Sequence, residues 1–207
     1  MSAEPLMIVV AGSNGAGKST FVARFLGEVD LPFINADELA KQALGRPAET
    51  REEADAAAAR AQEIRDLLIT SQSSFITETV LSDPVGAKVD FFASCEQSGY
   101  RVEFIFIGIE NSNLSRARVM QRVEDGGHDV PDEKIDSRFP RTLENLKRAL
   151  TKLQNIRLFD NSFANEPYRL VAEVEGGVLV KLSKRVPRWA ADIGLETLKN
   201  SNTKMIP

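Results

Sequence analysis

Residues 6–26 read LMIVVAGSNGAGKSTFVARFL, and this stretch decides the fold. Within it, GSNGAGKS from Gly12 to Ser19 fits the pattern G-x-x-x-x-G-K-[ST]. The motif follows the apolar run MIVVA and opens the amphipathic stretch STFVARFL. A strand, a glycine-rich loop and a helix in this order are typical of a P-loop, which binds phosphate oxygens through backbone N–H groups at the positive end of a helix. A glycine-rich turn without a ligand is the alternative.

The residue types of this motif each suit one part of a nucleotide. Its glycines let the backbone approach phosphate oxygens, Lys18 would reach the β- and γ-phosphates, and the Ser19 hydroxyl would be a Mg²⁺ ligand. The predicted nucleotide-binding residues are Gly12, Ser13, Asn14, Gly15, Ala16, Gly17, Lys18, Ser19 and Thr20.

Two classes of P-loop protein are excluded by what the sequence lacks. An ABC ATPase would need an LSGGQ-like signature and a strand that ends in Asp-Glu, and the chain has neither. A GTPase would need an NKxD-type base-recognition motif, which is also absent. A small kinase remains. Such an enzyme needs a carboxylate that receives the proton of the acceptor hydroxyl, arginines for the moving phosphoryl group, and a lid that excludes water.

Two carboxylates follow predicted strands. Asp37, in FINADELA, comes two residues after the strand at 32–35, at the edge where ligands of α/β proteins bind, so it is the candidate general base. The alternative for Asp37 is an N-cap of the helix that follows, and the two roles are compatible. Glu78, in FITETV, could hold the water shell of magnesium or orient the acceptor, with Thr79 beside it as a second substrate contact. The alternative for Glu78 is a solvated strand end.

Arginines bracket the segment EDGGHDVP, whose two glycines and proline predict a mobile loop. Arg122 precedes it, and Arg138 and Arg141 follow it. We therefore predict a lid over about residues 122–141 that carries phosphate-clamping arginines, the alternative for any one arginine being a solvated helix face. His128 lies within the lid, where it would contact substrate, stabilise the loop or act in catalysis.

Strand and helix patterns alternate along the chain, which predicts an α/β fold with a mostly parallel sheet. Nearly continuous apolar runs, typical of strands buried on both faces, occur at 6–11, 32–35, 74–78, 102–109 and 156–159. Helical patterns cover residues 18–27, 37–44, 49–69, 84–98 and 112–123. We therefore expect one P-loop kinase-like domain over residues 1–207, with a parallel sheet of about five strands flanked by helices.

The last third of the chain gives three further expectations. A helical leucine stripe follows Pro140, and the proline predicts a kink or a fresh helix start there. Two strand patterns around Gly176 and Gly177 predict a β-hairpin at about 168–182. The tail at about 199–207 has little to bury, so we expect it to fray.

Composition and charge limit the partners. The chain has 26 lysines and arginines against 30 acids, a net charge of −4, so broad nucleic-acid binding is not expected. The start MSAEPLMIVV lacks the basic region of a signal peptide, and no window is apolar enough for a membrane span. We expect a soluble, cytoplasmic protein without membrane contact. Cys95 is the only cysteine, so it forms no internal disulfide and is interpreted as a small buried hydrophobic residue.

Four sequence blocks together resemble the zeta-toxin family of P-loop kinases, in a short form without a long C-terminal extension. The blocks are VVAGSNGAGKST, FINADELA, FITETVLS and the lid stretch RVMQRVEDGGHDVPDEKIDSRFPRTLENL, with FDNS at residues 159–162 as a fifth. They span about residues 6–162, roughly three-quarters of the chain. The P-loop alone occurs in many families, whereas the lid block in this order is more specific.

The resemblance implies a phosphotransferase fold like that of nucleotide-monophosphate kinases, with ATP as donor and a sugar-nucleotide hydroxyl as acceptor. UDP-N-acetylglucosamine is the acceptor of the better-known members. The implied roles are phosphate and magnesium binding for Lys18 and Ser19, general base for Asp37, acceptor orientation for Glu78, and charge stabilisation for Arg122, Arg138 and Arg141. Two features depart from the family pattern: the stretch TVLSD after Glu78, and Pro140 between two of the arginines.

Three hypotheses follow for the function. The first is an ATP- and Mg²⁺-dependent kinase that phosphorylates a hydroxyl of a small molecule such as a UDP-N-acetyl sugar. The second is a kinase of an antibiotic or another small metabolite. The third, from a different class, is a module that holds ATP, binds a small antitoxin-like protein and turns over little. Asp37 favours the two enzymes, because a pure binding switch needs no base beside the phosphates.

Overall fold

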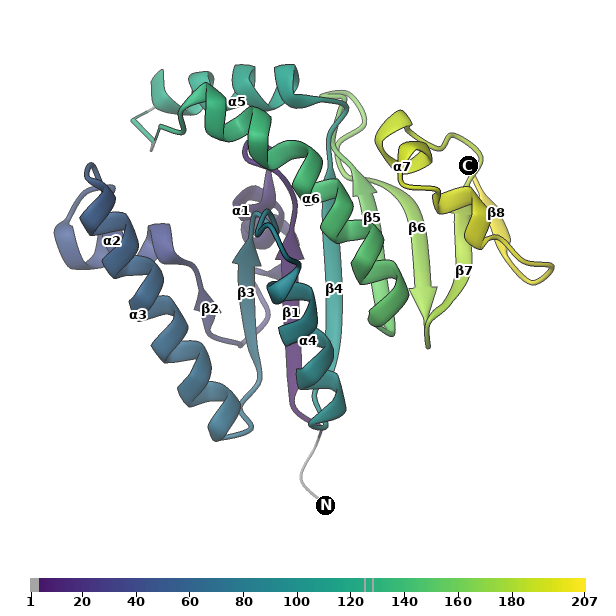
Figure 1. The fold of residues 1–207 in the computed structure, drawn as a ribbon, viewed down its shortest axis with the longest axis horizontal. Coiled ribbons are helices and arrows are strands. Elements are labelled where there is room, and N and C mark those ends of the chain that lie inside the picture. The colour runs from purple at the N-terminus through teal and green to yellow at the C-terminus, as the bar shows by residue number, and fades with distance from the viewer. Residues whose placement is uncertain (1–3, 125, 128) are drawn as a thin grey trace.

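The computed structural model describes residues 4–124, 126–127 and 129–207, and within them one eight-stranded sheet forms the middle layer (Figure 1). The strands are β1 (Leu6–Ala11), β2 (Phe33–Ile34), β3 (Phe75–Thr79), β4 (Arg101–Gly108), β5 (Asn155–Asp160), β6 (Arg169–Glu175), β7 (Val178–Ser183) and β8 (Lys204–Ile206). The helices are α1 (Lys18–Phe21), α2 (Ala36–Leu44), α3 (Arg51–Thr70), α4 (Ala87–Gln97), α5 (Ser112–Glu124), α6 (Asp132–Lys152) and α7 (Arg188–Asp192). A π-helical turn, Val22–Leu26, continues α1.

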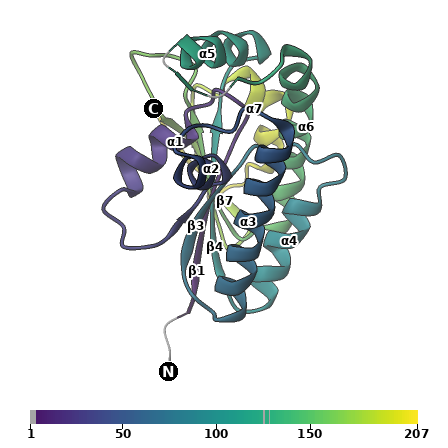
Figure 2. The ribbon, with the colours of Figure 1, turned by 90° about the vertical axis from the view of Figure 1, so that its left-hand side faces the viewer.

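Helices cover both faces of the sheet (Figure 2). α3, α4 and α6 lie on one face, and α1 lies on the other. Successive side chains of a strand point to opposite faces, so β1 serves both layers. Met7 and Val9 belong to the core under α4 and α6, whereas Ile8 and Val10 pack in a second core with Phe21 of α1. Burial on both faces is the physical reason for the continuous apolar runs in the sequence.

The five strands expected from the sequence form the parallel part of the sheet, in the order β2-β3-β1-β4-β5. Ala11, at the end of β1, pairs in register with Thr79 of β3 and with Phe106 of β4. The carboxyl ends of β1 and β3 therefore meet at one edge of the sheet, where ligands of such folds bind. The predicted α/β fold with a mostly parallel sheet is confirmed.

The expected number of about five strands was too low. The hairpin expected around Gly176 and Gly177 is present as β6 and β7, but β6 pairs antiparallel with β5 and so extends the same sheet. The expectation that residues 199–207 fray was wrong, because β8 pairs in parallel with β7, and Thr203 Oγ1 donates to Leu179 O at 3.0 Å. A segment of three residues is too short for a strand pattern to be recognised in the sequence, and β8 forms because it pairs with β7.

α6 runs from Asp132 to Lys152 through Pro140, so the fresh helix start expected at the proline was wrong. The helix begins directly after Pro131, and two acids occupy its first turn, where the helix dipole favours them. Pro140 is exposed, and the buried residues of the helix lie on both sides of it in sequence, from Ile135 to Leu150. Packing of this apolar face offsets the one backbone hydrogen bond that a proline removes.

One expectation from the sequence concerns the single cysteine, and another concerns membrane-spanning segments. Cys95 is 4% exposed, and desolvation raises the pKa of its thiol to about 11, so it is a buried, unreactive residue as predicted. Within the described residues, no helix is both long enough and apolar enough to cross a membrane.

Candidate active site

The P-loop joins β1 to α1 at the carboxyl edge of the sheet. Gly15 and Gly17 have φ angles of 67° and 91°, a region that L side chains rarely adopt. A Cβ on Gly15 would lie 2.8 Å from Ser115 O, and one on Gly17 would lie 2.7 Å from Asn161 Nδ2. The motif therefore needs these glycines both for its turn and for the close approach of neighbouring elements.

Side chains of other elements bind the carbonyl groups of this loop. The bonds are Ser115 Oγ to Asn14 O at 2.6 Å, Asn161 Nδ2 to Ala16 O at 2.9 Å, and Tyr168 Oη to Gly17 O at 2.9 Å. The backbone of the P-loop is thus held from outside the motif.

Lys18 is buried at the start of α1. Its Nζ donates to Ser13 O at 3.0 Å and lies 3.7 Å from Glu78 Oε1. Desolvation lowers the pKa of Lys18; the charge of Glu78 opposes this shift, and the charge of Arg122 adds to it. Asp37 also acts on this pKa, so all three side chains lie within electrostatic range of the ammonium group.

Glu78 joins the P-loop to the second strand. Its Oε2 accepts from Ser19 Oγ at 2.9 Å and from Asn35 Nδ2 at 3.1 Å. The parallel register explains this contact, because Glu78 pairs with Val10 two residues before the loop begins. Glu78 is therefore not a solvated strand end: it lies beside the predicted metal ligand Ser19.

Asp37 is not the N-cap of α2. Asn35 has that role, because its Oδ1 accepts from the backbone N of Asp37 at 2.8 Å and of Glu38 at 3.3 Å. The alternative interpretation of Asp37 as a cap was therefore wrong. The Asp37 carboxylate is left exposed at the rim of the site, where it is accessible to a substrate.

A polar cavity of about 450 Å³ brings most of the predicted residues together. Its lining comprises Asn14, Gly15, Gly17, Lys18, Ser19, Thr20, Asp37, Glu78, Val80, Arg118, Arg122, Asn161 and Tyr168. Gly12, Ser13 and Ala16 belong to the same loop but are buried beneath it. The P-loop, the candidate base and one predicted arginine, Arg122, thus share one cavity.

The other predicted arginines lie apart from this cavity. Arg138 lines a neighbouring cavity of about 850 Å³ between the start of α3 and the connection from α5 to α6. Arg141 is turned back on its own helix, with Nε donating to Ser137 O at 2.8 Å. The structure therefore separates Arg122 from Arg138 and Arg141. His128 lies outside the described residues.

Thr79 is buried, and its hydroxyl does not line the cavity. Its Oγ1 accepts from Lys88 Nζ at 2.8 Å and from the backbone N of Leu81 at 3.1 Å. The structure thus shows Thr79 binding the ammonium group of Lys88, at the start of α4.

Lys88 is the centre of a group of cations that the sequence did not single out. Desolvation lowers the pKa of Lys88, and the charge of Arg65 lowers it further. Asp83 opposes the shift, whereas Arg138 and Lys18 add to it. Within the described part of the chain, neither Arg65, Lys88 nor Arg138 forms an ion pair with a carboxylate. We call these three residues the Lys88 cation group.

Sequence reasoning also missed Asn35, Ser115, Asn161 and Tyr168. Asn161 lies in the block FDNS, which gave a weak signal. Asn35 lies in the block FINADELA, where only Asp37 was singled out. Ser115 and Tyr168 had no signal, because their contacts with the P-loop depend on how segments far apart in the sequence pack together.

The hydrogen-bonding groups and oxygen ligands that line the P-loop cavity fit ATP with Mg²⁺. Backbone amides of the P-loop, the Lys18 ammonium and the guanidinium groups of Arg118 and Arg122 suit phosphate oxygens. Hydroxyl and carboxylate oxygens of Ser19 and Glu78 suit Mg²⁺, which takes one or two protein oxygens and keeps the rest of its shell for water and phosphate.

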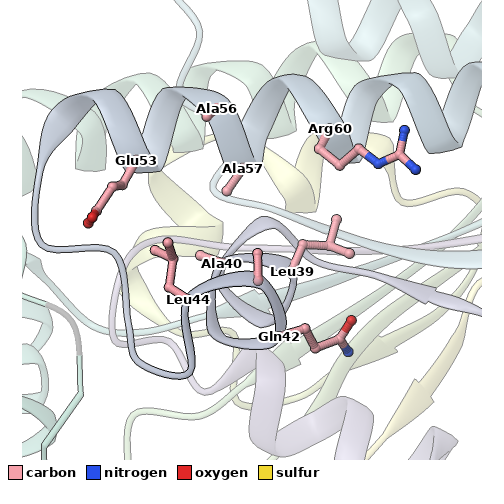
Figure 3. Close-up of a pocket in the computed structure, with 9 residues that line it drawn as sticks. Leu39, Ala40, Gln42, Leu44, Glu53, Ala56, Ala57 and Arg60 are labelled. Atoms are coloured by element: carbon pink, nitrogen blue, oxygen red, sulfur yellow. The ribbon is translucent and has the colours of Figure 1, made fainter.

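A third, more apolar cavity of about 460 Å³ lies between α2 and α3 (Figure 3). Leu39, Ala40 and Leu44 of α2 face Ala57 of α3 across it. Its one carboxylate, Glu53, is paired with Arg46 at 2.7 Å. The lining thus offers no free reactive group, and we assign no chemistry to this cavity.

Solved structures share this fold. A chain of the AvrRxo1-ORF1:AvrRxo1-ORF2 complex with sulphate ions has a TM-score of 0.67 at 18% identity, covering 97% of this chain and 64% of that chain, so our chain spans slightly less than two thirds of its length. The PezAT toxin-antitoxin system of Streptococcus pneumoniae gives 0.61 at 19% identity, over 83% of this chain and 73% of that chain. A putative kinase from Chloroflexus aurantiacus gives 0.56 at 15% identity, over 95% and 100%.

Sequence comparison identifies the family, whereas the structural matches show only the fold. An uncharacterized protein of Haemophilus influenzae is 26% identical over 132 residues, which cover 64% of this chain and 91% of that protein. A family model described as Zeta toxin matches residues 1–170, which contain every residue of the candidate active site. The chain therefore belongs to the zeta toxin family.

Proposed function

We propose that the chain is a phosphotransferase that moves the γ-phosphoryl group of ATP to a hydroxyl of a small molecule. One observation carries the proposal: Lys18, Ser19, Glu78 and Asp37 surround a single cavity at the carboxyl edge of the sheet. Membership of the zeta toxin family supports it. A structure of similar fold, at 19% identity, is of a complex with ATP.

The side chains have distinct roles in this reaction. Lys18 binds the β- and γ-phosphates, and Arg118 and Arg122, which line the same cavity, offset negative charge. Bound Mg²⁺ would neutralise charge on the same phosphates, held through Ser19 and Glu78. Asp37 accepts the proton of the attacking hydroxyl, because its carboxylate is exposed and is the acidic group of the cavity that no described hydrogen bond engages.

The acceptor in this proposal carries negative charge. Arg65 and Arg138 each repel the charge of Lys88, and an anionic acceptor would offset that repulsion. A UDP-N-acetyl sugar has such charge on its diphosphate, and we propose it as the first acceptor to test. The alternative is another small metabolite or an antibiotic.

A protein partner also forms part of the proposal. Two similar structures come from a toxin-antitoxin system and from a two-protein complex. On this basis we propose that a small antitoxin-like protein controls the chain, which would work in the cytoplasm as a single kinase-like domain.

A direct experiment tests the activity. The protein is incubated with Mg²⁺, ATP and a panel of metabolites that includes UDP-N-acetylglucosamine, and both ADP release and products heavier by one phosphoryl group are followed by mass spectrometry. We expect one class of anionic hydroxyl compound to gain the phosphoryl group, and the Lys18→Ala variant to produce none. No phosphorylated product from any acceptor would contradict the proposal.

A further inference from the structure

The segment between β5 and β6 contacts the P-loop at two successive carbonyl groups. Asn161 Nδ2 donates to Ala16 O, and Tyr168 Oη donates to Gly17 O, both at 2.9 Å. Asn161 is buried and Tyr168 is half-buried, so water competes little for these bonds. We propose that Asn161 and Tyr168 are positioning residues that orient the P-loop amides toward the donor phosphates. This inference rests on the proposed function.

The geometry of the peptide bond gives the mechanism. In a trans peptide the C=O and N–H groups point in opposite directions, so a carbonyl held on one side of the loop turns the next amide to the other side. Holding Ala16 O orients the N–H of Gly17, and holding Gly17 O orients the N–H of Lys18. Ser115, through Asn14 O, does the same for Gly15 from the other flank. The amides are thereby arranged before the nucleotide arrives, which lowers the cost of binding.

Tyr168 is itself held in an unusual conformation. Its φ angle is 55°, which non-glycine residues rarely adopt and which costs energy unless surrounding contacts maintain it. Its ring packs edge-on against Phe21 and Phe25, with centroids 5.3 and 5.5 Å away. These contacts aim the hydroxyl at Gly17.

A buried ion pair closes the base of this segment. Asp160, directly before Asn161, accepts from Arg169 Nη2 at 3.2 Å, and Arg169 directly follows Tyr168. Asp160 also accepts from Trp189 Nε1 at 3.1 Å, and Arg169 donates to Ser183 Oγ at 2.9 Å.

Ser183 and Trp189 lie beyond residue 170, where the match to the family model ends. The C-terminal part of this chain therefore supports the phosphate site through the segment between β5 and β6.

The chain offers a matched control for the test, because it has two tyrosines and both hydroxyls donate to backbone carbonyls. Tyr100 Oη donates to Leu68 O at 3.1 Å and to Ser73 O at 2.9 Å, away from the site. Calorimetry with MgATP is carried out on the wild type, Tyr168→Phe and Tyr100→Phe, and thermal melting without nucleotide reports on the fold of each.

We expect Tyr168→Phe to raise the Kd of MgATP by about 2- to 10-fold, the effect of losing one neutral hydrogen bond, while Tyr100→Phe leaves it unchanged. Both variants should lose comparable thermal stability. Asn161→Leu, which removes the neighbouring donor, should raise the Kd in the same way. Equal Kd values for Tyr168→Phe and Tyr100→Phe would overturn the inference alone, whereas a wild type that does not bind MgATP would overturn the proposed function as well.

Discussion

The proposed donor side, around Lys18, and the proposed acceptor side, around Lys88, differ in how their charges are satisfied. On the proposed donor side, Lys18 has Ser13 O and the Glu78 carboxylate near its ammonium group, and Ser19 donates to the same carboxylate. On the proposed acceptor side, the charges of Arg65 and Arg138 lower the pKa of Lys88, and within the described residues neither Lys88 nor Arg138 forms an ion pair with a carboxylate.

This difference indicates how each side binds its ligand. The donor side is organised in advance, since Lys18 and Ser19 already have partners and the P-loop is held by side chains of other elements. On the proposed acceptor side, a bound anion would offset the repulsion that Arg65 and Arg138 exert on Lys88. Substitutions on the donor side should therefore affect turnover most, and substitutions on the acceptor side should affect acceptor binding.

The largest effect is expected for Asp37→Asn. The change keeps the shape of the side chain and removes its basicity, so kcat should fall by about 10²- to 10⁴-fold with nearly unchanged MgATP affinity. Asn35 remains the cap of α2, so the melting temperature should stay the same. Glu38→Gln, one residue further along the helix, is the control and should keep full activity. Full turnover in Asp37→Asn would show that this carboxylate is not the base.

Arg138 and Arg141 were predicted as parts of one clamp, but their guanidinium groups have different surroundings. Arg138→Ala should raise the KM for an anionic acceptor by about 10-fold and leave the Kd of MgATP nearly unchanged, because Arg138 lies outside the P-loop cavity and within electrostatic range of Lys88. Arg141→Ala should have a smaller effect, since its guanidinium is bound to Ser137. Steady-state kinetics on both variants measures the difference. Equal acceptor KM values in the two variants would contradict a role of Arg138 in acceptor binding.

Lys88→Gln tests the acceptor side alone. Loss of one charged hydrogen-bond donor should raise the KM for an anionic acceptor by about 10-fold and leave the Kd of MgATP unchanged. Lys152→Gln, which removes a cation paired with Asp90, is the control. An unchanged acceptor KM in Lys88→Gln would remove this residue from the acceptor site.

The pH dependence of the wild type sharpens this prediction. Desolvation and the neighbouring cations lower the pKa of Lys88 from its usual 10.5. The charged form binds the anion, so acceptor affinity should weaken as pH rises toward that lowered pKa, and Lys88→Gln should lack this dependence. A rise in affinity with pH would have the wrong sign.

The smallest expected effect concerns the lid predicted over residues 122–141, whose closure stays a prediction. ATP together with an acceptor should slow hydrogen exchange of the backbone amides of residues 122–124 and 129–141, because bound phosphates would draw Arg122 and Arg138 together. Mass spectrometry of the corresponding peptides measures this exchange. Equal exchange with and without both ligands would indicate a rigid surface segment.

Local pattern predicted the elements of the sheet well. β1 was predicted with its exact bounds, because a strand buried on both faces is apolar throughout. β8 was missed because three residues gain strand structure only from β7. The continuous α6 was missed because packing of its buried face outweighs the local penalty of Pro140.

The candidate site was predictable where a motif carried it. Lys18 and Ser19 followed from the P-loop, and Asp37 and Glu78 from their positions at strand ends. The surroundings of Lys88 were not predictable, because Arg65 and Arg138 come near it only when α3 and α6 pack beside α4. Tyr168 was not predictable either, since 151 residues separate it from Gly17.

Binding of MgATP to the wild type and to Lys18→Ala tests the central claim most directly. Lys18 is buried, its ammonium group lies near Ser13 O and Glu78 and lines the P-loop cavity, and we propose that it binds the β- and γ-phosphates. Calorimetry should show MgATP binding to the wild type and at least about 10²-fold weaker binding to Lys18→Ala, with both proteins folded by thermal melting. Equal MgATP affinity in the two proteins would contradict the assignment of this loop as the donor site.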